Sequence, residues 1–325
     1  MTWKTLKYQW QWQLKSSPAQ LWPYLADTQR VNQAAHLPVI VYAETPLETG
    51  GSQRTGHSSK FGLTVEWEEH PFEWVREREY SVLRVFKQGP LARVYTYMLL
   101  EPNAHGTLVK YTVEVTPANL IGFLGSFYQF GWDSRRNFER VFYQIDEAIQ
   151  HQTEQVIPLQ VISLAKPAQA RLSELTRQLA LQSYDLRWTQ RLAHLVLTAP
   201  DEDLVRLRPY ALADAWGAPR RMVLELFLSA AKLGLLNMRW DIMCPLCRGA
   251  KVVARSLDEV HKGVHCPTCN IDFEADLAQN VELTFTPHPQ IRPVYGHTYC
   301  VGGPMVTPHI LVHQIIEPGE SCTLS

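Results

Sequence analysis

The chain has almost no excess of charge of either sign. Its 31 lysine and arginine residues nearly balance its 32 aspartate and glutamate residues, which leaves a formal net charge of −1. That balance excludes a general electrostatic attraction to nucleic acid or to anionic membranes. The sequence also lacks an apolar run of roughly 18 residues, the length that a membrane-spanning helix needs. Its first residues lack the continuous apolar region of a secretory signal.

The sequence has few cysteines outside one compact pattern. Four of its six cysteines lie in two C-x2-C pairs, which leaves too few for a disulfide framework. This usage suits a reducing compartment, so we expect a cytoplasmic protein. A hydrophobic fraction of 46% and a charged fraction of 19% are typical of globular proteins. The length of 325 residues predicts two or three domains.

The strongest chemical signal is the run CPLCRG, followed after a gap by HCPTCN. Each C-x2-C turn presents two thiolates from one bend, and Zn²⁺ prefers four soft ligands in a tetrahedron. The gap between the pairs falls in the window of roughly 15–20 residues that is typical of zinc ribbons. The sequence therefore predicts one structural Zn²⁺ per chain, because four thiolates leave no open position for a substrate. Its ligands would be Cys244, Cys247, Cys266 and Cys269.

Two alternatives to this zinc site stay open. The cysteines could be reduced, buried thiols or form two disulfides, or His265 could replace one cysteine as a ligand. A second group, comprising His297, Cys300, His309 and His313, also invites a metal, but its spacing matches no standard metal-binding pattern.

The first 150 residues show a change of hydrophobic period. Residues 8–14 alternate apolar side chains with glutamines, which predicts a half-buried strand. Ser17, Pro18 and Gln20 predict a helix that begins with a capping box. Residues 37–116 predict consecutive antiparallel strands, with turns at Gly50–Gly51, Gly89–Pro90 and Asn103–Gly106. Residues 120–152 have helical spacing of apolar residues, which predicts a long amphipathic helix.

One strand, two short helices, a run of strands and a long final helix resemble the helix-grip fold of the START-like superfamily (SRPBCC, polyketide cyclase-like proteins). The segments SPAQLWPYLADTQRVNQ (17–33) and WEEHPFEWVREREYSVLRVFKQGPL (67–91) carry this resemblance. It implies a sheet wrapped around the last helix, with an apolar cavity between them that either holds a hydrophobic ligand or is filled by side chains. The candidate ligand-binding residues are Trp10, Trp12, Phe86, Tyr95, Tyr97, Tyr111, Phe127 and Phe130.

The second half begins after a proline-containing stretch and is mainly helical at first. Two helices joined by the turn 216–219 resemble a winged helix, whose second helix could enter a DNA groove. That helix carries only Arg220, Arg221 and Lys232 as cations, with Glu225 between them. A DNA-reading helix needs a clustered basic surface, so the sequence favours a helical packing module and disfavours a nucleic-acid partner.

Three longer segments resemble one bacterial family: RLRPYALADAWGAPRRMVLELFLSAAKLGLLNMRWDIMCPLCRG, HCPTCNIDFEADLAQNVELTF and YCVGGPMVTPHILVHQ. This family is the adenylate cyclase-associated domain of unknown function that precedes the catalytic domain of some class III adenylate or guanylate cyclases. The resemblance implies a regulatory role and a nucleotide cyclase as effector. No cyclase catalytic motif occurs in these 325 residues, so either a cyclase domain follows in a longer protein or this is a stand-alone regulatory relative.

The predicted fold class is α+β, with a START-like helix-grip domain at 1–153, a linker at 154–170 and an adenylate cyclase-associated domain at 171–325. Within the last domain we expect a winged-helix-like block (171–240), a zinc ribbon (241–276) and a β region (277–325). The predicted function is a non-catalytic regulatory or sensory module that binds a hydrophobic small molecule or lipid and acts on an effector such as a nucleotide cyclase. The alternatives are a polyketide cyclase or aromatase-type enzyme and a zinc-ribbon, winged-helix DNA-binding protein.

Overall fold

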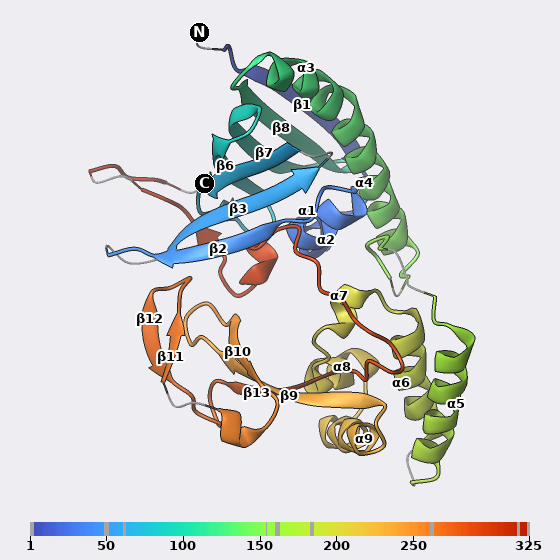
Figure 1. The fold of residues 1–325 in the computed structure, drawn as a ribbon. Helices are drawn as coiled ribbons and strands as arrows, with labels where there is room; N and C mark the ends of the chain where they lie inside the picture. Colours follow the sequence, from blue (N-terminus) through green and yellow to red (C-terminus); the bar gives the residue numbers. More distant parts are fainter. Residues whose placement is uncertain are drawn as a thin grey trace. The chain divides into compact units, whose positions relative to one another are not determined.

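A computed structural model describes residues 3–48, 52–60, 63–153, 155–159, 163–182, 185–260, 263–316 and 319–323. The chain forms two compact units (Figure 1): residues 1–159 together with 298–325 form the first, and residues 160–297 form the second. The change of unit after residue 159 falls inside the predicted linker at 154–170. The predicted turn at Gly50–Gly51 lies outside the described residues.

The first unit is built on one antiparallel sheet in the order β1-β8-β7-β6-β4-β3-β2. The first strand pairs with the last long one, Trp10 opposite Tyr111, which places the two ends of the strand series side by side. A short strand, β5, extends from β6 and also pairs with β14. The strands are β1 (Leu6–Leu14), β2 (Val41–Pro46), β3 (Ser52–Lys60), β4 (Leu63–Glu69), β5 (Glu73–Val75), β6 (Glu79–Gln88), β7 (Leu91–Asn103), β8 (Gly106–Pro117) and β14 (Val312–His313).

Helices cover one face of this sheet. The predicted capping box is confirmed, because the Ser17 side chain accepts from the backbone of Gln20 and the Gln20 side chain accepts from the backbone of Ser17. The long helix predicted at 120–152 is present but is interrupted by one π-helical turn, η1. The α+β helix-grip arrangement is confirmed, since α4 lies along the sheet (Figure 1). The buried apolar residues of α4 belong to the same core as those of the sheet. The helices are α1 (Pro18–Leu25), α2 (Thr28–Ala34), α3 (Leu120–Tyr128), η1 (Gln129–Asp133) and α4 (Ser134–Gln150).

Residues 298–313 pack on the first unit, whereas the sequence placed 277–325 in the second domain. The Gln29 side-chain oxygen accepts from the backbone N–H groups of both Tyr299 and Cys300. The Trp74 indole N–H donates to the carbonyl of Ile310, and β14 pairs with β5. These partners lie more than 200 residues away in the sequence, so no local pattern could reveal them. The predicted domain boundary is corrected accordingly.

The second unit combines a helical block with two small sheets. Its core joins the buried faces of the helices to β9 and β13, with Phe227 and Phe285 in edge contact. Gly217 ends α8 in the left-handed conformation at φ 65°, where a side chain would be strained. The elements are α5 (Lys166–Ala180), α6 (Leu186–Thr198), α7 (Asp201–Leu204), α8 (Pro209–Trp216), α9 (Arg220–Lys232), the sheet β10 (Ala250–Ala254), β9 (Leu236–Met243) and β13 (Val281–Pro287), and the hairpin β11 (Gly263–Cys266) and β12 (Ile271–Glu274). Within the described parts of both units, no helix has both the length and the apolar character to cross a membrane.

Candidate metal centre and buried polar site

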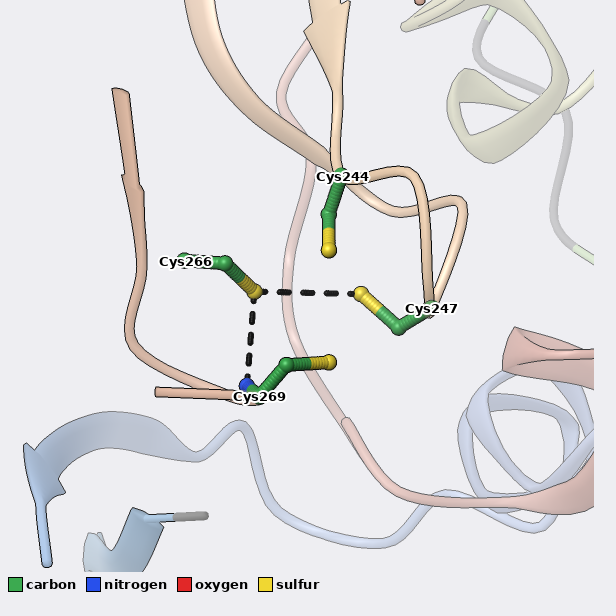
Figure 2. A group of neighbouring side chains, drawn as sticks. All are labelled: Cys244, Cys247, Cys266 and Cys269. Carbon is green, nitrogen blue, oxygen red and sulfur yellow. Dashed lines mark hydrogen bonds between the residues drawn. The ribbon is translucent and has the colours of Figure 1, made fainter. Parts of the chain in front are cut away.

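The four predicted zinc ligands come from two equivalent turns of the second unit. Cys244 follows β9 and Cys247 precedes β10, whereas Cys266 ends β11 and Cys269 precedes β12. The residue after each second cysteine, Arg248 or Asn270, has a positive φ (56° and 51°). The two turns therefore bend in the same way, which aims both pairs of thiols at one point, as Figure 2 shows.

The distances in this cluster fit one tetrahedral ion. The four sulfur atoms all lie within 4.8 Å of one another, and the Sγ atoms of Cys247 and Cys266 are 3.9 Å apart. A tetrahedron with Zn–S bonds of about 2.3 Å has S···S edges of about 3.8 Å. The backbone N–H of Cys269 points to the Cys266 sulfur at 3.4 Å (Figure 2), as expected for a thiolate acceptor. The donor set is therefore compatible with a zinc site.

Electrostatics in the cluster also favour a bound cation. Burial raises the pKa of Cys269, and the charges of the neighbouring Cys247, Cys266 and Cys244 raise it further. Burial opposes ionisation of Cys244 as well, but backbone N–H groups of Cys247 and Leu246 lower the pKa of this thiol. Four thiols this close cannot all ionise without a positive charge among them, and a bound divalent cation would supply that charge.

The alternative ligands named from the sequence are not part of this group. The His265 ring is 2.9 Å from the Asp272 carboxylate on the exposed side of the β11–β12 hairpin. Of the second set of predicted ligands, Cys300 is buried in the first unit and His313 stacks on Trp74. Among the described residues, only the four cysteines of the two C-x2-C turns form a group that could hold a metal ion.

The aromatic residues predicted to line a ligand cavity in the first unit mostly fill its interior. Trp10 stacks on Tyr111 with ring centroids 5.8 Å apart, and Trp12 makes an edge contact of 5.1 Å with Phe142 of α4. Phe86 and Phe130 are partly buried and pack against the same core. The alternative of a packed aromatic core therefore describes this part of the interior.

Three of the predicted ligand residues do not face the interior. The buried positions of β7 are Val94, Thr96, Met98 and Leu100. The alternating Tyr95 and Tyr97 therefore lie on the opposite face of the sheet. The Tyr97 hydroxyl donates to Glu79 at 2.6 Å. Phe127 on α3 is 51% exposed. The prediction that these residues line the cavity is corrected, because aromatic composition alone does not tell one face of a strand from the other.

A buried polar network lies on the inner face of β2, β4 and β6. The Glu69 side chain has no solvent exposure, and its Oε2 accepts from the Tyr42 hydroxyl at 2.9 Å and from Arg84 Nε at 2.8 Å. Its other oxygen, Oε1, is buried without a hydrogen-bond partner among the described residues, as is the indole N–H of Trp67. A buried carboxylate oxygen and a buried N–H both lose free energy when they lack a partner.

The C-terminal segment adds a thiol to this network. Burial, followed by the charge of Glu69, raises the pKa of Cys300. Burial also raises the pKa of Tyr111, to about 12. Although burial opposes its charge, Arg84 has a raised pKa because the Glu69 carboxylate and the Tyr42 hydroxyl lie beside it. The site thus pairs one stable cation with one carboxylate inside an aromatic shell.

The sequence carried a signal for this network that aromatic composition obscured. Strand alternation places Glu69 on the same face as Trp67, and Arg84 on the same face as Phe86. A charged residue two positions from an inward-facing aromatic residue indicates either a buried ion pair or a functional group.

A separate groove of about 400 Å³ lies between α1 and the end of α4, and its lining includes Gln20, Tyr24 and Gln152.

The cations of α9 are engaged within their own unit. Arg220 forms a bidentate pair with Asp214, at 2.8 and 2.7 Å, and Arg221 pairs with Glu225 at 2.8 Å. Acidic partners at these positions weaken the phosphate-binding potential that a recognition helix needs. The structure therefore gives α9 the character of a packing helix.

Comparisons with known proteins match the two halves of the chain separately. Residues 169–301 match a family described as "Family of unknown function (DUF5939)". The comparison with curated proteins gives no match.

Solved structures similar to part of the chain include three single proteins. A putative uncharacterized protein from Rhizobium leguminosarum has 15% identity and a TM-score of 0.32, covering 43% of this chain and 95% of that protein. A protein from Thermus thermophilus has 15% identity and a TM-score of 0.32, and the match covers 46% of this chain and 100% of that protein. An aromatase/cyclase from a Streptomyces strain has 9% identity and a TM-score of 0.31, and the match covers 43% of this chain and 93% of that protein.

Proposed function

We propose that the first unit is a non-catalytic binding module for a small molecule with an apolar body and one hydrogen-bond donor. The observation that carries this proposal is the buried Glu69 Oε1, which lacks a partner within a network whose other members are paired. A ligand hydroxyl or amine would supply the missing donor. The indole N–H of Trp67, two positions along the same strand, would donate a hydrogen bond to an acceptor atom of the same ligand.

The residues that surround Glu69 also suggest how a ligand would enter. Gly302 lies so close to β3 and to the β4–β5 connection that a Cβ atom would be 2.7 Å from Arg54 and 2.9 Å from Phe72. Cys300 and Met305 pack against the core of the same unit. Residues 300–305 therefore fill space that a ligand needs, and we expect binding to move this segment aside.

An enzymatic function of the cyclase or aromatase type has less support from the site. The Cys300 thiol is the candidate nucleophile in this network. Burial raises its pKa, which favours the protonated, weakly nucleophilic thiol. Arg84 stays charged beside Glu69 and so cannot serve as a base. The network is suited to holding a polar group in place.

In the second unit, we propose that one zinc ion holds the β9–β10 turn to the β11–β12 hairpin as a structural clamp. Four thiolates would complete its coordination and leave no position for a reacting water. The further proposal, that this unit relays ligand binding to an effector such as a class III nucleotide cyclase, is supported only by the resemblance of residues 170–325 to cyclase-associated domains. Sequencing the gene beyond the codon for Ser325 tests it, since a cyclase catalytic domain in the same reading frame is the expected result. A stop codon there would remove the case for a covalently attached effector.

Native mass spectrometry of the purified full chain tests the binding proposal. We expect a noncovalent adduct, or a binder among panels of lipids and aromatic polyketides, that is lost in Glu69→Gln. Glu101→Gln is the matched control, because Glu101 pairs with Lys110 outside this network. If no compound binds, or if both variants bind equally, Glu69 is not a ligand contact and the proposal fails.

A further inference from the structure

Helix α3 buries its small residues and exposes most of its large apolar ones. Its buried positions are the small residues Gly122 and Ser126, and a Cβ atom at Gly122 would lie 1.8 Å from the carbonyl oxygen of Pro90. Most of its large apolar residues are exposed instead. An amphipathic helix of a globular protein normally buries these side chains, so the fold of the first unit does not explain them.

The exposed residues form one continuous stripe along α3 and η1. Spacings of three and four residues place them on neighbouring turns, and each is more than half exposed. We call the following set the α3 stripe: Leu120, Ile121, Leu124, Phe127, Tyr128 and Trp132. An apolar stripe of this size on a surface helix marks an interaction site.

Cations border the α3 stripe at both ends. The run from Leu120 to Trp132 contains no charged residue, and the exposed Arg135 and Arg136 follow it on α4. The Arg136 guanidinium lies 5.0 Å from the centre of the Trp132 ring. At the other end, Lys4 is exposed and is next to Trp3, whose ring contacts Phe123. The acidic neighbours are Asp133 and Glu139, both half-buried.

We propose that the α3 stripe binds the surface of a membrane that contains anionic lipids. Leucine, isoleucine and phenylalanine would enter the boundary of the acyl chains, while Trp132 and Tyr128 would lie at the level of the headgroups. The bordering cations would contact lipid phosphates. This surface is local, so it is consistent with a chain whose net charge is only −1.

The charges disfavour a second copy of the chain as the occupant. In a twofold dimer through this stripe, an antiparallel pair of helices would bring Lys4 of one copy to Arg135 and Arg136 of the other. A parallel pair would bring like cations together as well. Both arrangements place positive charges opposite one another, which opposes association.

Flotation of the full chain with lipid vesicles tests this proposal. We expect binding to phosphatidylcholine vesicles that contain roughly 30 mol% phosphatidylserine, and weaker binding when salt rises from about 0.1 M to about 1 M. Leu124→Gln combined with Trp132→Gln should lower the partition coefficient by about tenfold or more, because both side chains lose apolar contact. Arg135→Gln combined with Arg136→Gln should lower it by roughly fivefold per arginine, and only on anionic vesicles.

Two exposed leucines of the second unit provide the matched control. Leu181 and Leu277 are 73% and 62% exposed, so Leu181→Gln with Leu277→Gln removes similar apolar surface elsewhere. This variant should float like the wild type. Absence of flotation with either vesicle type would overturn the proposal, as would equal losses in the control variant. A dimer in size-exclusion chromatography that Leu124→Gln dissociates would instead assign the stripe to a second copy.

Discussion

Each of the two units contains a buried pair of an arginine and a carboxylate, and the two carboxylates differ in how fully they are hydrogen-bonded. In the second unit, Asp201 accepts from Arg292 at 2.8 Å through Oδ1 and from the backbone of Tyr295 at 3.0 Å through Oδ2. Arg292 also donates to the carbonyl of Val196. In the first unit, the Tyr42 hydroxyl and Arg84 Nε both donate to Glu69 Oε2, and Glu69 Oε1 has no donor among the described residues.

The difference separates a structural pair from a candidate binding site. Asp201 and Arg292 connect the start of α7 to the end of α6 and to residues after β13, so they hold the helical block of the second unit together. Glu69 and Arg84 connect neighbouring strands that are already paired through their backbones. The Glu69 network adds little to connectivity and leaves an acceptor unsatisfied, and this is the observation behind the proposed ligand site.

The largest expected effect concerns the metal, on which only the second unit should depend. Cys244→Ser should abolish stoichiometric zinc and remove hydrogen-exchange protection from residues 236–287, because structural zinc sites contribute about 10–16 kcal/mol of apparent binding free energy. The strands β1 and β8 of the first unit should keep their protection. Elemental analysis and hydrogen exchange measure both effects. The exposed Cys322 provides the control Cys322→Ser, and one zinc per chain in both variants would contradict this assignment.

The next largest effect should come from the Asp201–Arg292 pair, in which both carboxylate oxygens accept a hydrogen bond. Asp201→Asn leaves the Arg292 charge without a counterion where that side chain is only 1% exposed. Breaking such a pair typically costs about 3–5 kcal/mol. Urea denaturation monitored by the tryptophans of the second unit measures the loss. A cost below that of Glu69→Gln would reverse the ranking of the two pairs.

A smaller effect is expected from Glu69→Gln in the absence of ligand. The Arg84 side chain is 17% exposed and keeps some contact with water, so we expect a loss of about 1–3 kcal/mol. In Glu69→Gln the new amide NH2 would replace Oε1, an atom that had no hydrogen-bond partner among the described residues. Urea denaturation monitored by the tryptophans of the first unit measures this value. A loss as large as that of Asp201→Asn would indicate that Glu69 is mainly structural, and the comparison between the pairs would then fail.

The smallest effect is expected from an exposed pair on α9. Arg221 and Glu225 lie in water, with the arginine side chain 91% exposed, so Arg221→Met should leave the midpoint of unfolding within error of the wild type. Thermal unfolding followed by circular dichroism measures the midpoint. A clear shift would show that α9 has a partner surface that the pair helps to form.

Local patterns in the sequence predicted the elements well. The capping box at Ser17, the alternation in β1 and the helical spacing in α4 each depend on residues within one or two turns or along one strand. The same holds for the cysteine knuckles, because two thiols of a C-x2-C turn are brought together by the turn itself. The strand order and the helix-grip arrangement were available only through the family resemblance.

The orientation of side chains in three dimensions was harder to predict. Tyr95 and Tyr97 have the same aromatic character as Trp10 and Tyr111 but lie on the other face of the sheet. The α3 stripe has the composition of a buried helix face, yet its small residues pack and its large residues are exposed. Periodicity identifies that a face exists but does not say what covers it.

The sequence by itself determined the secondary structure, the position of the cysteine cluster and the predominance of aromatic residues in the first interior. Only the tertiary structure decided that residues 298–313 return to the first unit and that Glu69, Arg84 and Tyr42 converge beside Cys300. The physical reason is the range of the interactions. Turns, caps and strand alternation are set by interactions between near neighbours. Burial and pairing of Glu69 instead depend on four segments, which contain Tyr42, Glu69, Arg84 and Cys300 and are far apart in the sequence.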